Sequence, residues 1–394
     1  MSRIGTETAF EAAARARALE ATGRSVIHLE IGEPDFDTPR HIKDAAVRGL
    51  LEEGMTHYTA AEGIAPLRQA IADDVRRWKG IEAKPDQVIV TPGAKPIMFY
   101  AMLAVVDEGD EVIYPNPGFP IYESMAEYVG GVAVAAPLRE EREFRMDVEE
   151  VASLVTPRTR MIVINSPHNP TGSVMTPDDV RAVAEIANRH DLLVLADEIY
   201  GRLQYEGEPL SIATLPGMAE RTITLDGFSK TFAMTGWRLG YGIVPAWLAP
   251  TFSRLVINSV SCTNAFAQAG AIAALTGPQD SANAMREEFI ARRTLMVDGL
   301  NVIPGVSCVM PHGAFYVFPN LSSFSRSSAD IATHLLYDAG VCGLAGTAFG
   351  RHGEGYLRFS YANSRDNILA AVERMGESLG RLERTGDLVT SSAG

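Results

Sequence analysis

The stretch RMIVINSPHNPTGSVMTPDDVRAVAEIANRHDLLVLADEIY, residues 160–200, determines the fold class. It begins with an apolar run (160–167), continues with a helical pattern from TPDDV onward, and then reaches a second apolar run, LLVLAD (192–197). Both runs are apolar throughout instead of alternating with polar residues, which is typical of strands covered by helices on both faces. A strand, a helix and a second strand in this order predict a mostly parallel α/β sheet.

The same alternation continues on both sides of this stretch. Further strands are expected over 87–91 (QVIVT), 111–115 (EVIYP) and 221–227 (RTITLDG), with helices through PIMFYAMLAVVD and YESMAEYVG between them. A chain of 394 residues also exceeds the length that one hydrophobic core usually serves, so two domains are expected.

After about residue 290 the pattern changes. A charged helix, MREEFIARRTLMVDGL, is followed by GAFYVFPNL, a helix near 328–339, YLRFSYA and a final helix over 365–384. We therefore predict a large domain over 45–290 and a smaller α+β domain formed by 1–44 together with 291–394.

Composition and charge restrict the class of partner. The formal net charge of −14 disfavours nucleic acid and anionic membranes, which need clustered Lys and Arg. Cys262, Cys308 and Cys342 form no CxxC pair, and the eight histidines show no metal-ligand spacing, so no metal is expected. The first 23 residues lack the apolar segment of a signal peptide, and no apolar run reaches the ~18 residues of a membrane helix. We expect a cytoplasmic protein.

Polar groups follow four of the expected strands. PGAKP (92–96) follows the first, and the amides of Ala94 and Lys95 at a helix start would bind an anion such as phosphate. NSPHNPTG (165–172), Asp197 and Lys230 follow three others. Each has an ordinary alternative reading as a turn, a helix cap or a surface lysine, but ligands of open α/β sheets bind at these strand ends, where the groups would meet.

Taken together, these groups suit the chemistry of one cofactor. A lysine in apolar surroundings or near positive charge has a lowered pKa, so its amine is nucleophilic. A helix N-terminus with Arg238 would hold a phosphate, and Asp197 at a ring nitrogen would keep a pyridine protonated. These are the requirements of pyridoxal 5′-phosphate (PLP) as cofactor.

The motifs resemble, in their order along nearly the whole chain, those of the fold-type I PLP enzymes, specifically the class I/II aminotransferases near the aspartate aminotransferase group. They are IGEPDFDTP (31–39), YTAAEGIAPLRQAIA (58–72), TPGAK (91–95), NPGFPIY (116–122), NSPHNPTG (165–172), DEIY (197–200), SKTFAMTGWRLGY (229–241) and LRFSYA (357–362). The resemblance implies a sheet sandwiched by helices and a ping-pong transfer of an amino group from an L-amino acid to a 2-oxo acid, for which we expect 2-oxoglutarate. It also implies a homodimer with active sites at the subunit interface.

The resemblance further implies residue roles. Lys230 resembles the lysine that carries PLP as a Schiff base and shuttles the substrate proton. Asp197 resembles the partner of the pyridinium nitrogen. Asn169 and Tyr200 resemble the groups that bond the cofactor's 3′ oxygen, and Asn169 is also expected to contact substrate.

Other matching positions would hold the phosphate and the substrate. Arg238 and the backbone of Gly93, Ala94 and Lys95 resemble the phosphate cradle, and Tyr58 resembles the tyrosine that reaches the phosphate from the other subunit. The family's serine three residues before the lysine is Gly227 here, so that phosphate contact is either missing or supplied by Ser229. Phe119 stands where an aromatic stacks on the pyridine ring beside the substrate. Arg358 resembles the residue that holds the substrate α-carboxylate bidentately, a task that lysine does poorly, and Gly32 resembles the glycine that closes over that carboxylate.

Several alternatives stay open at this stage. A β-lyase acting on sulfur-containing amino acids, a racemase or a decarboxylase would use an almost identical cofactor site. A regulatory PLP sensor would carry a basic DNA-binding domain, and only about 25 residues precede SVIHLEIGEPDF here. A nicotinamide dehydrogenase is disfavoured because no GxGxxG follows a strand.

The amino donor also stays open between aspartate, for which no second arginine can be placed at the side-chain pocket, an aromatic or aliphatic amino acid, and a specialised pathway substrate. The segment CGLAGTAFG (342–350) differs from the family pattern and is expected near the substrate. Five phenylalanines could make the pocket apolar, although they could equally belong to the core: Phe10, Phe36, Phe119, Phe315 and Phe349.

Overall fold

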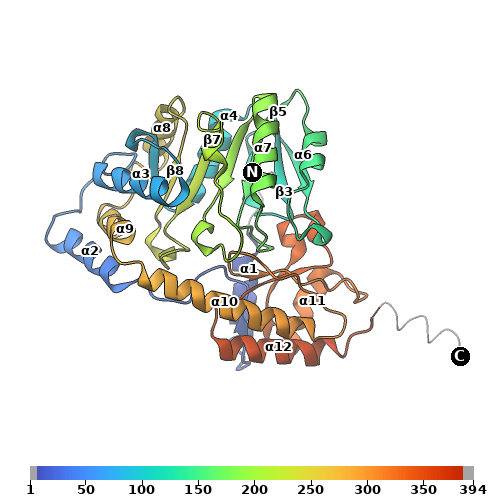
Figure 1. Cartoon of the computed structure of the whole chain (residues 1–394). Coiled ribbons are helices and arrows are strands. Elements are labelled where there is room, and N and C mark those ends of the chain that lie inside the picture. The colour runs from blue at the N-terminus through green and yellow to red at the C-terminus, as the bar shows by residue number, and fades with distance from the viewer. Residues whose placement is uncertain (1–6, 385–394) are drawn as a thin grey trace, which may run out of the picture.

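The computed structural model of the chain describes residues 7–384, which form a seven-stranded sheet in the order β2-β8-β7-β6-β5-β3-β4. Neighbouring strands run parallel, except that β8 is antiparallel to both β2 and β7. The strands are β2 (Val88–Thr91), β3 (Glu111–Asn116), β4 (Val132–Pro137), β5 (Thr159–Asn165), β6 (Leu193–Asp197), β7 (Thr222–Gly227) and β8 (Gly240–Ile243). The predicted mostly parallel α/β sheet is confirmed (Figure 1).

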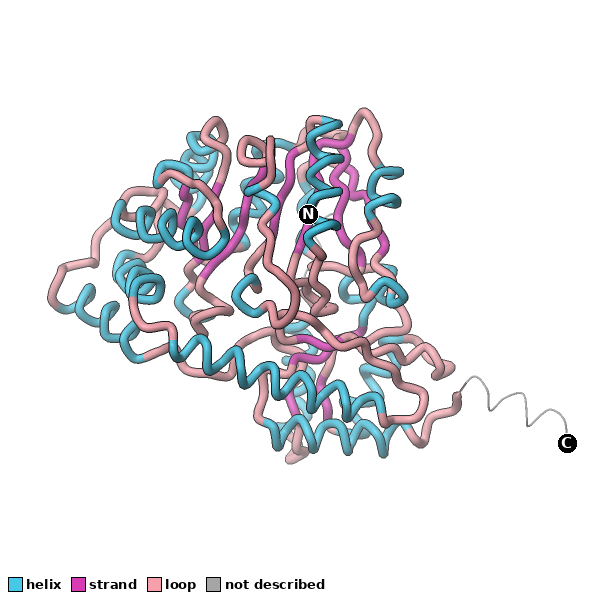
Figure 2. Tube along the Cα trace, viewed as in Figure 1, coloured by secondary structure: helices cyan, strands magenta, loops and turns pink. Residues whose placement is uncertain are grey.

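Helices cover both faces of this sheet (Figure 2). Side chains alternate between the faces along each strand, so that Val112 packs in one core cluster and Ile113 in another. Because both positions are apolar, the sheet is buried on both sides, as the uninterrupted apolar runs predict. On one face lie α4 (Lys95–Val105), α5 (Ile121–Tyr128) and α8 (Ala249–Ser259); on the other lie α6 (Val148–Leu154) and α7 (Pro177–His190).

Three further helices cover the β2–β8 end of the sheet. They are α2 (Arg40–Leu51), α3 (Ala65–Lys79) and α9 (Ala265–Thr276), and their apolar residues share one core cluster with Val88, Val90 and Ile243. The helices begin where their sequences favour it: α7, for instance, has Thr176 as N-cap in a capping box with Asp179, and Pro177 in its first turn.

A second layer lies below the large sheet (Figure 1). In it β9 (Tyr316–Val317), β12 (Leu357–Ser360) and β11 (Leu344–Ala345) form an antiparallel sheet, and β1 (Ile27–His28) pairs in parallel with β10 (Val341–Cys342). Its helices are α1 (Ala9–Glu20), α10 (Asp280–Asn301), α11 (Ser328–His334) and α12 (Arg365–Leu379). The predicted helix near 328–339 continues from α11 as a π-helical turn, Leu335–Ala339, and the final helix ends at Leu379, five residues before the predicted end.

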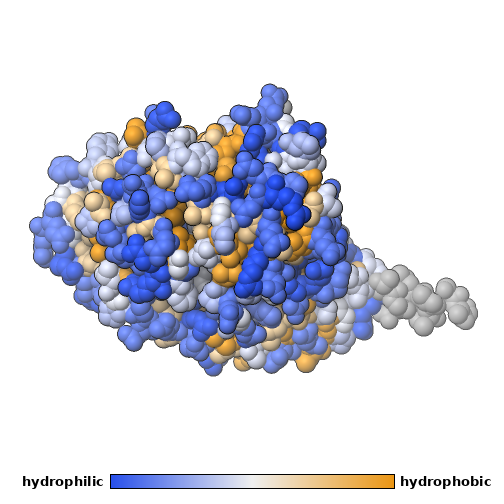
Figure 3. All heavy atoms as spheres, turned by 45° about the horizontal axis from the view of Figure 1, so that its top comes forward, coloured by the Kyte–Doolittle hydropathy of each residue, from blue (hydrophilic) through white to orange (hydrophobic). Residues whose placement is uncertain are grey.

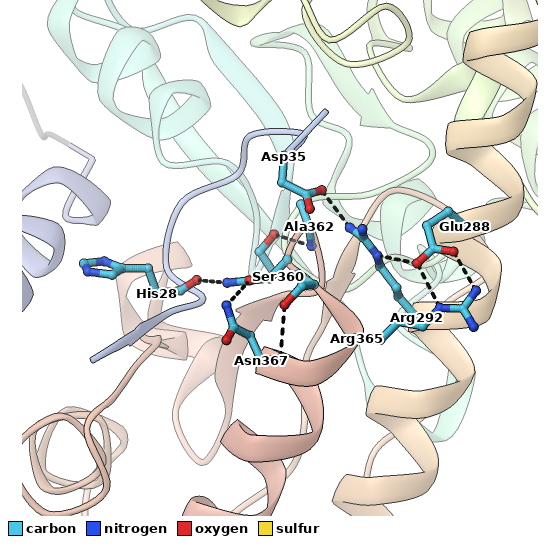
Figure 4. Close-up of polar contacts among 10 residues, drawn as sticks. His28, Asp35, Glu288, Arg292, Ser360, Ala362, Arg365 and Asn367 are labelled. Carbon is cyan, nitrogen blue, oxygen red and sulfur yellow. Dashed lines mark hydrogen bonds and ion pairs between the residues drawn. The ribbon is translucent and has the colours of Figure 1, made fainter. Parts of the chain in front are cut away.

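The segment after β1 is fastened to this second layer by a chain of ion pairs (Figure 4). Arg292 of α10 donates to Asp35 at 2.7 Å and to Glu288 at 2.9 Å, and Glu288 also accepts from Arg365 at 2.6 Å. The amide of Asn363 donates to the backbone carbonyl of His28 at 3.0 Å. These bonds fix the loop that carries Gly32 against α10 and α12.

The exterior is largely hydrophilic on the face shown in Figure 3, where hydrophobic residues lie in small groups between hydrophilic ones. Within residues 7–384, no helix combines the length and apolar character that crossing a membrane requires.

Candidate active site

The predicted site residues meet in a cavity of about 530 Å³ at the carboxyl ends of the parallel strands, against the second layer. Such strand ends are where open α/β sheets bind their ligands. Eleven of the predicted residues line it: Gly32, Ala94, Lys95, Phe119, Asn169, Asp197, Tyr200, Ser229, Lys230, Arg238 and Arg358.

Lys230 follows β7 and extends its amine toward the second layer. Its Nζ donates to the backbone carbonyl of Gly32 at 2.6 Å and lies 6.0 Å from the ring centre of Tyr200. Burial lowers the pKa of Lys230 to about 8; Glu33 opposes this change, while the positive charges of Arg358 and Lys95 add to it. The amine is therefore far more often neutral near pH 8 than that of an exposed lysine. The predicted low polarity is the main cause, and the contributing cations are Arg358 and Lys95.

Asp197 ends β6 and is buried. One carboxylate oxygen accepts a hydrogen bond from the Tyr122 hydroxyl at 2.6 Å, and the other accepts from the backbone N–H of Ile199 at 3.2 Å. Burial raises the pKa of Asp197 to about 6, whereas the two hydrogen bonds act in the opposite direction. A positive charge brought next to this carboxylate would hold it in the ionised form.

Arg358 lies on β12, and its guanidinium is almost fully buried. It is enclosed by the rings of Tyr316 and Phe349, whose centres lie 4.4 and 4.8 Å from the guanidinium carbon. Its nitrogens donate to Asn169 Oδ1 at 3.0 Å and to the backbone carbonyl of Glu30 at 2.5 Å, while its buried Nε has no hydrogen-bond partner within residues 7–384. A planar cation fixed in this way presents the geometry that a carboxylate recognises.

Asn169 and Tyr200 hold neighbouring positions on the cavity wall. The backbone N–H of Asn169 donates to Asn165 Oδ1 at 2.9 Å, and the Tyr200 hydroxyl lies 2.7 Å from that of Tyr316. Gly32 needs its lack of a side chain here, because a Cβ would lie 2.0 Å from the Tyr316 oxygen.

An anion cradle is formed by the turn before α4 and the segment after Lys230. Gly93 has φ +82°, and a Cβ on it would lie 2.2 Å from a guanidinium nitrogen of Arg238. Gly240 of β8 approaches the same turn so closely that a Cβ would lie 2.3 Å from the Ala94 nitrogen. The first amides of α4, which have no partner within the helix, thus lie close to Arg238, and Ser229 lines the same cavity.

Two predicted residues are not part of the cavity lining. Gly93 lies just outside it, beneath Arg238, whereas Tyr58 is 89% exposed in the loop between α2 and α3. Three of the five phenylalanines, Phe10, Phe119 and Phe349, line the cavity. The other two do not: Phe315 is buried in the core, and Phe36 packs edge-on against Phe289.

Sequence reasoning missed several residues of the cavity. Tyr122 lies in a quoted motif, but only the fold shows that it faces Asp197. Asn165, at the end of β5, donates to the backbone carbonyl of Asp197 at 3.0 Å, and Tyr316 comes from the distant β9. The segment 342–350 was expected near the substrate, and it contributes Leu344, Ala348 and Phe349 to the lining.

The cavity fits a phosphorylated pyridine cofactor in three respects. Gly93 and Gly240 leave room for a phosphate at the start of α4, where a Cβ at either position would displace Arg238 or the Ala94 amide. The buried carboxylate of Asp197 is available to pair with a protonated ring nitrogen. The Lys230 amine, with its lowered pKa, lines the same cavity.

The chain is similar in sequence and in fold to known aminotransferases. Residues 24–375 match the family "Aminotransferase class I and II". The chain is 41% identical over 358 residues to "Aromatic-amino-acid aminotransferase 2" of Thermococcus litoralis (90% of this chain, 92% of that one), and 38% identical over 382 residues to "Aspartate aminotransferase" of Musicola paradisiaca (96% and 95%). The solved structure of an aspartate aminotransferase from Thermus thermophilus with maleate superposes with a TM-score of 0.91 at 38% identity (96% and 99%).

Proposed function

Because the chain belongs to the class I and II aminotransferases, we propose that Lys230, Asp197 and Arg358 perform its reaction in the cavity at the strand ends. Members of this family depend on PLP and move an amino group from an amino acid to a 2-oxo acid, and this protein is such an enzyme. The names of its relatives do not favour a β-lyase. One observation carries the assignment of residues: an amine, a buried carboxylate and a buried guanidinium line one cavity beside an anion cradle.

When bound, PLP supplies a carbonyl that condenses with amines and a ring that accepts an electron pair. Asp197, held by Tyr122 and the Ile199 amide, keeps a proton on the ring nitrogen by its negative charge. With PLP bound, Lys230 would take the proton from the substrate Cα and deliver it to the cofactor carbon C4′, a task that a neutral amine can perform near pH 8. Arg358 binds the substrate α-carboxylate and orients the Cα–H bond toward Lys230.

Borohydride reduction of the PLP-loaded protein tests the role of Lys230. We expect the mass of the reduced cofactor on the peptide that contains Lys230, and on no peptide of the Lys230→Ala variant. Attachment to Lys95, which lines the same cavity, would overturn the assignment.

In Asp197→Ala the cofactor should still bind, but turnover should fall by about 100-fold or more, since the electron sink is weakened.

We further propose that the amino donor has an aromatic or aliphatic side chain and that 2-oxoglutarate is the acceptor. The support is the apolar part of the cavity lining, which includes Phe10, Ile31, Leu344 and Phe349. One relative is named for aromatic amino acids and another for aspartate. Values of kcat/KM for phenylalanine, leucine and aspartate with 2-oxoglutarate test this; a tenfold preference for aspartate would contradict it.

The domain limits, the assembly and the location are proposals too. Residues 45–290 would form the PLP-binding domain, and 1–44 with 291–394 the smaller one. Ile27 and Leu29 share a core cluster with Phe359 and Met375, which supports this grouping, although α10 crosses the limit at 290.

Exposed apolar residues on α2, such as Leu50 and Leu51, support a homodimer in which Tyr58 reaches the partner's site. The enzyme would work in the cytoplasm, which cell fractionation can check.

A further inference from the structure

A lysine with little exposure lies behind strands β6 and β7, outside the cavity. Lys79, the last residue of α3, places its ammonium 2.6 Å from a carboxylate oxygen of Glu198 and 2.6 Å from one of Asp226. Only 7% of the Lys79 side chain and 13% of each carboxylate side chain are exposed. Solvent therefore screens these three charges only weakly.

The two carboxylates are directly connected to the strand positions that face the cavity. Asp197 pairs in register with Leu225, and both line the cavity. Glu198 follows the first and Asp226 follows the second. Because side chains alternate along a strand, these two carboxylates point to the other face, where Lys79 lies between them.

Both carboxylates influence Asp197. Burial is the largest cause of the raised pKa of Asp197, and the negative charges of Asp226 and Glu198 contribute to it. Tyr122 of α5, whose hydroxyl donates to Asp197, and Tyr200 in the turn after β6 interact with it as well. A positive charge next to Glu198 and Asp226 therefore opposes the protonation of Asp197.

Lys79 supplies that charge. Although burial lowers the pKa of Lys79, the negative charges of Asp226 and Glu198 hold it above the ordinary value of a lysine, so the ammonium stays protonated. Asp74 and Arg202, which pair with each other at 2.7 Å, act together with Asp226 and Glu198 on the hydroxyl of Tyr241 in β8. Among the described residues, Lys79 is thus the cation in direct contact with both carboxylates.

We infer that Lys79 is a positioning residue of the transamination: it offsets the charges of Glu198 and Asp226 and thereby keeps Asp197 ionised at the ring nitrogen of the cofactor. The inference rests on the role proposed above for Asp197. Through these two ion pairs Lys79 also ties α3 to both strand ends. The carboxylates themselves are held in place, because the other oxygen of Glu198 accepts from the Ser211 hydroxyl at 2.6 Å and that of Asp226 from the Gly227 amide at 2.7 Å.

The test is the pH titration of the absorbance of bound PLP in substrate-free enzyme. In Lys79→Met the three groups change from a net charge of −1 to −2, so nearby groups bind protons more tightly and the transition should move up by about one pH unit, a tenfold change in proton affinity. In Asp226→Asn it should move down by a similar amount. The double variant Lys79→Met/Asp226→Asn restores the net charge without the ion pairs and should titrate near the wild type.

A matched control removes a cation from a buried carboxylate elsewhere. Arg158 lies 2.5 Å from Glu111, which is the first residue of β3 and so lies at the amino ends of the parallel strands, opposite to the cavity. Arg158→Met should leave the titration unchanged. A shift equal to that of Lys79→Met would overturn the inference, because the effect would then be general.

The remaining outcomes also decide the matter. A double variant as strongly shifted as Lys79→Met would mean that Lys79 has only a structural role. If Lys79→Met does not fold, Asp226→Asn decides, and the absence of a downward shift overturns the inference. Asp197→Asn distinguishes a failure of the proposed function from a failure of this inference. If Asp197→Asn titrates like the wild type, the proposed role of Asp197 fails. If Asp197→Asn differs from the wild type and Lys79→Met does not, only the role of Lys79 fails.

Discussion

Lys230, the proposed catalytic amine, binds its proton more weakly in the folded protein than in the unfolded chain. Its pKa is lowered to about 8 by burial, while an unfolded chain has a lysine pKa of about 10.4. Between these values the unfolded state binds one proton more than the folded state. The contribution of this group to stability is therefore lowest below pH 8 and rises as the pH increases through this window.

Thermal unfolding of the cofactor-free protein can measure this effect. Relative to Lys230→Met, the wild type should gain in melting temperature as the pH rises from about 7 to about 10, because methionine has no proton to lose. The difference between the two proteins cancels other titrating groups. A difference that stays constant over this range would contradict the lowered pKa.

Arg358 illustrates how packing prepares a single side chain. Held between Tyr316 and Phe349, it has little freedom to lose when a carboxylate binds. In Arg358→Lys the bidentate contact is lost, and we expect kcat/KM to fall by about 100-fold. The absorbance of bound cofactor should not change. An altered cofactor spectrum would instead indicate that Arg358 supports the cofactor site.

At the scale of elements, the contact between β8 and the start of α4 determines the anion cradle. In Gly240→Ala the added Cβ would lie 2.3 Å from the Ala94 nitrogen, a backbone atom that moves only with the whole turn. We expect affinity for PLP to fall by about tenfold or more, measured by equilibrium dialysis. Gly376→Ala in α12 meets only ordinary contacts, the nearest at 3.6 Å, and should bind PLP normally. Equal affinity of both variants would contradict the cradle.

Strands β2, β3, β5, β6 and β7 could be predicted because each is an uninterrupted apolar run next to a helical pattern. Strands β4 and β8 give weaker signals: three of the six residues of β4 are alanines, which are depleted in strands. In β8, Gly240 and Gly242 weaken the apolar signal, and the strand forms because its glycines allow close packing on α4. The carboxyl ends of the predicted strands also located Asp197 and Lys230. Tyr316 was missed because its place in the cavity depends on how the two layers meet.

At the scale of the whole molecule, we expect the chain to assemble as a homodimer. The chain has a mass of 42.5 kDa, and we expect twice this value by light scattering. Leu51, 74% exposed on α2, should lie in the interface, so Leu51→Glu should weaken dimerisation by at least about tenfold. Leu369→Glu, at a 52% exposed position on α12, is the matched control and should remain dimeric. A monomeric wild type would contradict the shared site.

The pairing of β1 with β10 has a consequence for synthesis on the ribosome. Ile27 pairs with Val341, so 314 residues separate the two partners along the chain. At a translation rate of about 5–20 residues per second, the N-terminal segment waits on the order of 15–60 s for its partner to be made. The large sheet, whose strands all lie before residue 244, can assemble during this delay. Ile27 and Leu29 meanwhile lack the part of their core that Val341, Phe359 and Met375 supply, so this apolar segment completes its packing only when synthesis is nearly finished.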